Sequence, residues 1–586
     1  MRLLPVLPAA MAAAISLAAP SAAWADSPVL IDGGDEDMRD TLRELLPDRD
    51  PPESLFDAER IAEEAAERAM VWLRSEGYYG ATVTPEATEE PPAARLVIAP
   101  GPRFSFTAPE IEFVGDPPDS GTAAEARRAI GAVSPGAPAR AGEVLTAEAE
   151  ALAALQSGGY PDATPRERRV VVDHAATSVA ADFRFDAGAR ARLGGLSAEP
   201  ADVFRPGFID DLQNWATGDI YTPDALARLR RDLSSTGAVS RVSTRLGEPN
   251  ANGVREVILD IEPARRNAYE LGVSYSTSEG PGVVGEWTRR NFTGRADALT
   301  IGSTLAEQQQ DFSVELARPH AAGLGHTVTV GAGVEREAPA AYTRTGASVY
   351  ASVDASTRLR LGRSYGVTLT ASQYDDLLGP VSEAVVLSGF YALRHDTTEF
   401  TLDPLDGSTV DLRVEPSVSS GDETLGFVRL IGEGRVYESF GREDSLTLAA
   451  RIRGGWLEAL AGDADDVPPD RRFYAGGGGS VRGYDYNSIF PLDRVALGLT
   501  PGGQGLLEGS VEVRWRFGAR LGAVAFVDAG AAFDDWQDAG DLAIGVGVGA
   551  RYDLGFAPLR VDVALPLDDE FAADDYALYI SIGQAF

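Results

Sequence analysis

The sequence predicts tandem α+β modules of β-α-α-β-β form, followed by a 16-stranded antiparallel transmembrane β-barrel. Helix-like segments that end at glycine recur in the N-terminal part, where Gly77, Gly159 and Gly237 are 82 (159 − 77) and 78 (237 − 159) residues apart. From about Ala268 onward, helical spacing gives way to period-two alternation. Past residue 25, no stretch approaches the ~18 uninterrupted apolar residues of a membrane helix, so strands must form any membrane span.

The first 25 residues read as a secretory signal peptide. Arg2 precedes an apolar, Ala-rich stretch from Leu3 to Ala19, and Ala23-Trp24-Ala25 has the A-x-A form of a cleavage site. A short membrane anchor is the alternative, and the prolines inside the stretch argue against it. We therefore expect an exported mature chain that begins at Asp26.

The composition excludes several classes of protein. A formal net charge of −37 argues against nucleic-acid binding, because nothing would offset phosphate repulsion. With 44% hydrophobic residues, the chain is too apolar for a disordered acidic protein. The absence of cysteine excludes disulfide scaffolds and thiolate metal sites. Acidic pairs such as Asp568-Asp569 and Asp574-Asp575 are read as solvated loop tips in preference to calcium ligands, so we expect neither a metal nor a cofactor.

Three modules are expected at residues 26–100, 101–188 and 189–264. Each combines a helix with a later strand: Asp57–Glu76 with Arg95–Ala99, Leu145–Gln156 with Val179–Asp186, and Pro223–Ser234 with Arg255–Glu262. The first is expected to open with a strand at Pro28–Ile31 and a helix at Glu36–Leu46. Two helices would cover one face of a short sheet. Its exposed edges could then capture an extended peptide by strand addition.

Residues 265–586 are expected to form the barrel. About sixteen candidate strands occupy 319 residues (586 − 267), which is roughly 20 residues per strand plus turn. A soluble β-sandwich would also show alternation. However, charged residues recur on the second face in strand after strand, and a water-filled lumen tolerates them whereas a sandwich core does not. The sequence therefore favours the membrane barrel.

Closing the barrel requires its first strand, Tyr269–Ser276, to pair with its last, Leu578–Phe586. The last strand is short and holds Gly583 near its end, so we expect a weak junction that can open laterally. We call this junction the seam. The residues predicted to form it are Tyr269, Leu271, Val273 and Tyr275 on the first strand and Leu578, Ile580, Ile582 and the aromatic Phe586 on the last.

A connection from about Leu460 to Gly505 contains four consecutive glycines followed by Ser480 and then Val481-Arg482-Gly483-Tyr484. Connections longer than ~12–15 residues are usually functional. An arginine at the tip of such a loop requires a fixed acidic or aromatic partner. If the loop turns into the lumen, the inward-facing candidates on the next two strands are Glu508, Glu512 and Asp528. A phosphate-binding loop is excluded because no lysine follows the glycines.

These residues resemble the BamA/TamA superfamily of outer-membrane assembly factors. Val481-Arg482-Gly483-Tyr484 is similar to the loop-six motif of that superfamily, and Phe526-Val527-Asp528-Ala529-Gly530 is similar to its strand-13 pattern. The resemblance implies that the modules are POTRA domains. It also implies that Phe526 and Asp528 receive loop six, with Glu508 as a second partner of Arg482. More loosely, Arg394-His395-Asp396 with Pro404, Asp406 and Gly407 resembles a hairpin of the superfamily.

The resemblance also implies a function. Three modules are typical of the TamA branch, which implies insertion of β-barrel or autotransporter-type proteins through the seam. It further implies a location in the outer membrane lipid bilayer, periplasmic POTRA domains, unfolded outer-membrane protein clients and a TamB-like inner-membrane-anchored partner. A two-partner-secretion-type polypeptide exporter of the same superfamily and a passive channel are the alternatives. Enzymatic activity is not expected, because none of the four histidines lies beside a G-x-S-x-G or similar arrangement.

Overall fold

The computed structural model describes residues 29–47, 49–277, 280–356, 360–375, 382–421, 424–441, 445–518, 520–568, 571 and 574–584. The expected signal peptide and Phe586 lie outside these residues. The chain packs as two compact units, one of which combines the residues up to Leu193 with Gly218–Pro223 and Pro249–Val254. The other comprises Gly194–Thr217, Asp224–Glu248 and Arg255–Phe586. Across the described ranges, no helix is both long and apolar enough to cross a membrane.

The first module is a three-stranded sheet with two helices. Its elements are β1 (Val29–Gly33), α1 (Glu36–Leu45), α2 (Leu55–Ser75), β2 (Thr82–Glu89) and β3 (Pro92–Ala99). The side chain of Asp35 caps α1 by accepting a hydrogen bond from the Met38 N–H, and Ser54 caps α2 in the same way. Helix α2 buries Ile61, Ala65, Ala69 and Leu73, at the spacing seen in the sequence. The sheet order is β1-β3-β2, with β1 parallel to β3.

The second module has a four-stranded sheet around a central β7. Its elements are β4 (Ser105–Phe106), β5 (Glu110–Phe113), α3 (Ser120–Ala129), the 3₁₀ helix η1 (Ile130–Val133), α4 (Ala141–Ser157), β6 (Thr164–Asp173) and β7 (Ser178–Asp186). Strand β7 alternates buried and half-buried residues because one of its faces packs on the helices. Strand β6 pairs with β7 alone and is exposed along nearly all of its length.

The third module is joined to the barrel by hydrogen bonds. Its elements are β8 (Arg192–Glu199), α5 (Phe208–Asp211), α6 (Pro223–Ser234), β9 (Val239–Leu246) and β10 (Val254–Pro263), in the sheet order β8-β10-β9. The Asn291 side-chain amide donates to the Val203 carbonyl at 2.7 Å. Nδ1 of His320 accepts from the Gly325 N–H, so Nε2 carries the proton and donates to the Asp232 carbonyl at 3.0 Å.

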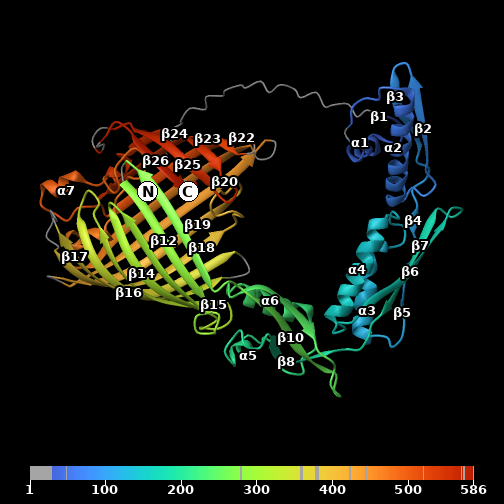
Figure 1. The fold of residues 1–586 in the computed structure, drawn as a ribbon, viewed down its shortest axis with the longest axis horizontal. Helices are drawn as coiled ribbons and strands as arrows, with labels where there is room; N and C mark the ends of the chain where they lie inside the picture. Colours follow the sequence, from blue (N-terminus) through green and yellow to red (C-terminus); the bar gives the residue numbers. More distant parts are fainter. Residues whose placement is uncertain are drawn as a thin grey trace, which may run out of the picture. The chain divides into compact units, whose positions relative to one another are not determined.

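The last sixteen strands form one closed antiparallel barrel, as Figure 1 shows for the green-to-red part of the chain. The predicted fold class is thereby confirmed, and two stacked sheets are excluded for this region. The strands are β11 (Asn267–Ser276), β12 (Gly280–Arg290), β13 (Ala298–Ala306), β14 (Gln309–Pro319), β15 (His326–Glu337), β16 (Thr343–Ser356), β17 (Leu361–Asp375), β18 (Glu383–Asp396), β19 (Gly407–Ser420), β20 (Thr424–Phe440), β21 (Leu446–Ala461), β22 (Gly505–Phe517), β23 (Leu521–Phe533), β24 (Ala543–Asp553), β25 (Pro558–Pro566) and β26 (Ala577–Ile582).

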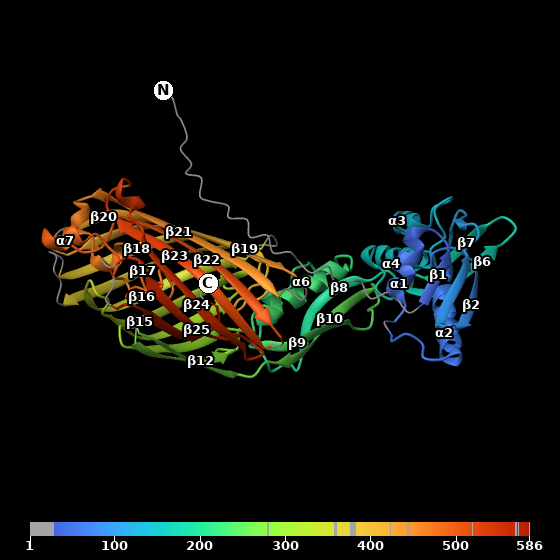
Figure 2. The same ribbon diagram turned by 90° about the horizontal axis from the view of Figure 1, so that it is seen from above.

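The barrel wall separates apolar from charged side chains. Leu271 and Val548 lie on the outer face and are 78% and 64% exposed. Charged residues of the other parity, such as Arg451 and Asp562, point into the bore and are buried there. This is the inverse of a soluble protein and fits a barrel surrounded by lipid with a polar interior. In the view turned by 90°, the strands run obliquely to the barrel axis, and α7 (Leu492–Ala496) lies at one end of the barrel (Figure 2).

Candidate functional site

The connection between β21 and β22 folds into the bore of the barrel. We call residues 462–504 loop six. It contains the 3₁₀ helices η3 (Ala464–Asp466) and η4 (Pro469–Arg471) and helix α7, and its arms pair at Phe473↔Gly503 and Ala475↔Ile489. The tip is fully enclosed: Arg482 and Tyr484 are each 1% exposed. At Gly483 the backbone has φ = +105°, a conformation that glycine adopts without strain.

Arg482 is the centre of a buried ion-pair network. Its Nε and Nη2 donate to the two carboxylate oxygens of Asp528 at 2.6 and 2.8 Å, and its backbone N–H donates to the same group at 3.2 Å. Its Nη1 lies 2.7 Å from Oε1 of Glu512 and 3.2 Å from Oδ2 of Asp562. A bidentate arginine–carboxylate pair is strong and fixed in orientation. Loop six is therefore attached to β22, β23 and β25 by one side chain.

Phe526 supplies an aromatic surface for the same guanidinium group. The Cζ atom of Arg482 lies 3.4 Å from the centre of the Phe526 ring, and Phe526 is two residues before Asp528 on the same face of β23. A desolvated cation over an aromatic ring is an attractive arrangement. The structure thus brings together Arg482, Phe526 and Asp528, three of the residues predicted to dock loop six.

The position of Glu508 differs from the expected pairing with Arg482. Glu508 accepts a hydrogen bond from the Ser480 hydroxyl, and its Oε2 lies 3.5 Å from Arg453 and 3.7 Å from Arg451. Glu508 and Glu512 share the inner face of β22 but are four residues, or about 13 Å, apart along the strand. The Arg482 side chain is level with Glu512, so Glu508 contacts loop six two residues earlier.

Three glycines on β24 make room for the tip of loop six, and the sequence interpretation gave them no role. A Cβ atom at Gly545 would lie 1.9 Å from the Arg482 carbonyl oxygen. At Gly547 it would meet the Phe526 ring at 2.2 Å, and at Gly549 the Asp562 carboxylate at 1.9 Å. The sequence does show glycine at every second position of this strand. That pattern indicates close packing of loop six only once it is known that loop six lies against β24.

Three more arginines belong to the Arg482 network and were not predicted. Nε of Arg560 donates to Oδ2 of Asp562 at 2.6 Å, and the Arg551 guanidinium also bonds that carboxylate. Arg514 donates to Glu512 at 2.9 Å. Because opposite charges are interleaved, no carboxylate of the network is buried alone. Period-two alternation predicts that these side chains face inward, but it does not predict which strands exchange contacts across the bore.

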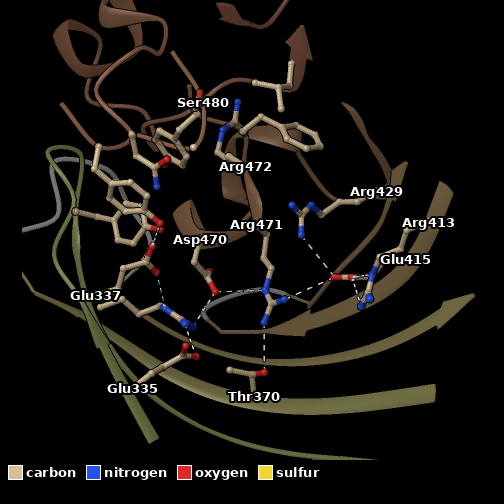
Figure 3. Close-up of a pocket in the computed structure, with 18 of the residues that line it drawn as sticks. Glu335, Glu337, Thr370, Arg413, Glu415, Arg429, Asp470, Arg471, Arg472 and Ser480 are labelled. Carbon is tan, nitrogen blue, oxygen red and sulfur yellow. Dashed lines mark hydrogen bonds and ion pairs between the residues drawn. The ribbon is translucent and has the colours of Figure 1, made fainter. Parts of the chain in front are cut away.

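A second group of charges holds the other arm of loop six. Nη1 of Arg344 on β16 donates to Asp470 at 3.0 Å, and the Tyr374 hydroxyl on β17 donates to the same carboxylate at 2.5 Å. The neighbouring Arg471 donates to Thr370 at 3.3 Å and lies 3.6 Å from Glu415, as Figure 3 shows. Loop six is therefore fixed to β16, β17 and β19 as well as to β22–β25.

Between loop six and the wall lies a polar cavity of about 670 Å³. Arg413, Arg429 and Glu415 border it on one side and Glu335 and Glu337 on the other (Figure 3). The lining of this cavity therefore carries charges of both signs. Across the residues that the structure describes, no group of three or more His, Cys, Asp or Glu side chains is placed to hold a metal ion.

The seam is held by few hydrogen bonds. Strand β11 pairs with β26 at Tyr275↔Ile580 and Ser276↔Tyr579, and Thr277 bonds with Leu578 just beyond them. Residues 271–274 of β11 form no ladder with the described residues 581–584 that they face in this register. Leu271 and Val273 lie on this part of β11, and both are exposed on the outer face, as is Tyr269.

The structure corrects one detail of the expected seam. The last strand ends at Ile582, not Phe586, because Gly583 has φ = +95° and breaks the extended conformation. In the observed register the paired residue numbers sum to 855, which places Val273 opposite Ile582. Leu578 and Ile580 remain close to β11, whereas Phe586 lies outside the described residues.

With this geometry in place, comparison with known proteins assigns the family. The sequence pattern described as the Omp85 superfamily domain matches residues 291–586, half of the chain, and includes loop six with its Arg482 partners. The chain belongs to the Omp85 superfamily. Among curated proteins, it is 24% identical over 392 residues to "Outer membrane protein assembly factor BamA" of Nitratidesulfovibrio vulgaris, covering 63% of this chain and 48% of that relative. The chain thus spans about half the length of the curated relative it matches.

One solved structure shows the same fold. A crystal structure of BamA from Haemophilus ducreyi lacking POTRA domains 1–3 is similar with a TM-score of 0.66 at 15% identity, covering 82% of this chain and all of that one. CdiB from Acinetobacter baumannii has a TM-score of 0.47 at 13% identity, with 81% and 89% covered. At these identities the likeness to BamA concerns the fold alone.

Proposed function

We propose that this Omp85 protein resides in the outer membrane and inserts unfolded β-barrel or autotransporter-type proteins into the bilayer through the seam. The observation that carries the proposal is the edge of β11 over residues 271–274, which forms no ladder with the described residues 581–584. An open strand edge presents N–H and C=O groups that can template an incoming strand. In lipid, such groups are costly to leave unsatisfied, so pairing with a client strand is favourable.

Loop six supports this proposal by keeping the rest of the wall in shape. Its two attachments, at Arg482 and at Asp470, join it to strands on different sides of the bore. A barrel that opens at one junction must not collapse at the others. We infer that Arg482, with Phe526, Asp528 and Glu512, keeps loop six docked while the seam opens.

The three N-terminal modules would lie in the periplasm and act as POTRA domains. Strand β6 of the second module supports this role, because it is a sheet edge that pairs only with β7 and exposes both faces. Such an edge can add a strand from a client or from a partner. A count of three modules is what the resemblance to the TamA branch rests on, and a TamB-like partner is inferred from that resemblance alone.

A disulfide lock across the seam tests the function. The chain has no cysteine, so Tyr275→Cys with Ile580→Cys places one pair at the observed register. The purified full chain in lipid vesicles would be given a urea-unfolded β-barrel protein, and its folded fraction measured by heat-modifiable mobility. We expect the oxidised lock to abolish insertion and a reductant to restore it.

The matched control is a lock at a fully paired junction. Val436→Cys with Ala450→Cys joins β20 to β21 at residues that are also opposite each other on the outer face. This disulfide should leave insertion unchanged. If clients fold equally well with the seam locked and with the control locked, the lateral route is wrong.

A further inference from the structure

The end of the last barrel strand bends away from β11 and into the mouth of the barrel. After Ile582, the Gly583 N–H still donates to the Pro558 carbonyl of β25 at 2.8 Å. The next residue, Gln584, instead donates its backbone N–H to the Leu402 carbonyl at 3.1 Å. Leu402 belongs to the connection between β18 and β19, eight strands from β26 around the ring. The chain therefore leaves the wall at this point.

The Gln584 side chain fixes this bend through two further hydrogen bonds. Its Nε2 donates to Oδ1 of Asp403 at 3.0 Å, and its Oε1 accepts from Nε of Arg551 at 2.7 Å. An amide is suited to this place because it offers a donor to a carboxylate and an acceptor to a guanidinium at once. Both contacts involve a charged partner, and such hydrogen bonds are the stronger kind.

The connection that receives Gln584 is itself held to the wall. We call residues 397–406 the strap. The Thr397 N–H donates to the Ser408 carbonyl, and the Ser439 hydroxyl and N–H on β20 donate to the Leu405 carbonyl and the Asp406 carboxylate at 2.8 and 2.9 Å. These bonds tie both ends of the strap to β18–β20. The strap includes Pro404 and Asp406, which the sequence singled out without a role.

We propose that the strap is a latch that holds the inner end of β26 away from β11, with Gln584 as its positioning residue. The register of the seam continued by two residues would place Val273 opposite Ile582, and by four would place Leu271 opposite Gln584. Gln584 cannot pair with β11 while it is bonded to Leu402 and Asp403. The latch thus keeps the edge of β11 available to an incoming strand. Its release would let β26 pair with β11 beyond the two observed residue pairs and close the seam. This inference rests on the proposed function of the seam.

Cross-linking measures the latch without any client. In the cysteine-free chain, Val273→Cys with Ile582→Cys reports how often the inner halves of β11 and β26 meet. Gln584→Glu replaces the donor to Asp403 by a second carboxylate and so breaks that bond. We expect the rate of disulfide formation in vesicles to rise about fivefold, the factor given by the loss of one net hydrogen bond. The reporter pair Tyr275→Cys with Ile580→Cys, outside the latch, should keep its rate.

A rescue variant separates a latch from a general loss of structure. Adding Asp403→Asn to Gln584→Glu reverses donor and acceptor, because the new amide can donate to the new carboxylate while Arg551 keeps an acceptor. This double variant should return the cross-linking rate to the parental value. Gln537→Glu, the same change at an exposed site in the connection after β23, is the control and should have no effect.

The outcomes divide cleanly. Unchanged cross-linking in Gln584→Glu, or a double variant that stays fast, overturns the latch whatever the protein does with clients. If cross-linking responds as expected but client insertion is unaffected by the Tyr275–Ile580 lock, the latch stands as a property of β26 and the proposed function fails. Faster cross-linking together with slower client insertion supports both.

Discussion

The junction between β20 and β21 and the junction between β11 and β26 close the same barrel in different ways. The first pairs continuously from Gly426↔Ala461 to Phe440↔Leu446, with one irregularity at its end. The second is a ladder of two residue pairs near one end of the barrel. Loop six bonds to β22, β23 and β25, and its Gly483 N–H also donates to the Tyr579 hydroxyl on β26 at 3.1 Å. Loop six therefore supports the wall as far as β26, and the short ladder between β26 and β11 is the weak junction.

Hydrogen exchange should show the largest contrast between the two junctions. Residues 271–274 of β11 have no ladder partner among the described residues 581–584, whereas β21 is paired on both sides. We expect exchange in that part of β11 to be at least about a hundredfold faster than in the centre of β21, following their different opening free energies. Equal protection of the two segments, measured by mass spectrometry in vesicles, would contradict the contrast.

Arg482→Glu should break the reinforced side. It places a fourth carboxylate among Asp528, Glu512 and Asp562 in a site that is 1% exposed. Breaking a buried ion pair costs about 3–5 kcal/mol. We expect a lower urea midpoint and protease cleavage within 470–490.

Arg336→Glu is the matched control for that change. It makes the same substitution at an exposed residue of β15 and should alter neither the urea midpoint nor the cleavage pattern. If Arg482→Glu had the same urea midpoint and cleavage pattern as this control, the Arg482 network would not be what holds loop six in place. Adding Asp528→Arg should restore part of the loss, because it returns a cation to the cluster.

Gly545→Ala should displace the tip of loop six by steric contact alone. The new Cβ would lie 1.9 Å from the Arg482 carbonyl, and overpacking of this kind costs about 1–3 kcal/mol. Gly285→Ala on β12 is the comparison, since a Cβ there has no neighbour within 4 Å. The free energy of unfolding should fall for the first and not for the second. Equal free energies of unfolding for the two variants would mean that β24 does not support loop six.

Asp470→Ala should destabilise the protein less than Arg482→Glu does and no more than Gly545→Ala does. It removes one partner of Arg344 and the acceptor of the Tyr374 hydroxyl, but Glu335 and Glu337 still neutralise the guanidinium. We expect a loss of about 1–3 kcal/mol, typical of leaving a buried donor unsatisfied. Protease cleavage near Arg471 should increase, with exposed Glu307→Ala as control. No change in cleavage would leave Arg482 as the main attachment of loop six.

The repeating features of the fold were predictable from the sequence. Helix α6 occupies Pro223–Ser234, the predicted range, because apolar spacing and a glycine stop define it locally. The barrel strands were predictable because each must present apolar residues to one side and polar residues to the other. The first and third modules follow the predicted β-α-α-β-β order, whereas the second begins with two strands, β4 and β5, before its helices.

Depth and register were not predictable in the same way. Glu508 and Glu512 have the same parity on one strand, and choosing between them requires knowing how far Arg482 reaches into the bore. Asp562 lies 80 residues beyond Arg482 on a strand whose neighbours in the ring are known only once the barrel is closed. Gly583, which ends β26, is visible in the sequence, but the hydrogen bond from Gln584 to Leu402 just beyond it is a contact that no local pattern encodes.

Loop six has a consequence for how the protein withstands lateral pressure. A barrel resists sideways pressure because its wall is continuous. When the seam opens, the wall is interrupted along one line, and the surrounding bilayer can then flatten the barrel. Arg482 pairs with Asp528 on β23, and Asp470 pairs with Arg344 on β16. These two strands are seven places apart in a ring of sixteen, so loop six spans the bore and connects distant parts of the wall. With loop six in this position, the seam can open while the barrel keeps a round cross-section.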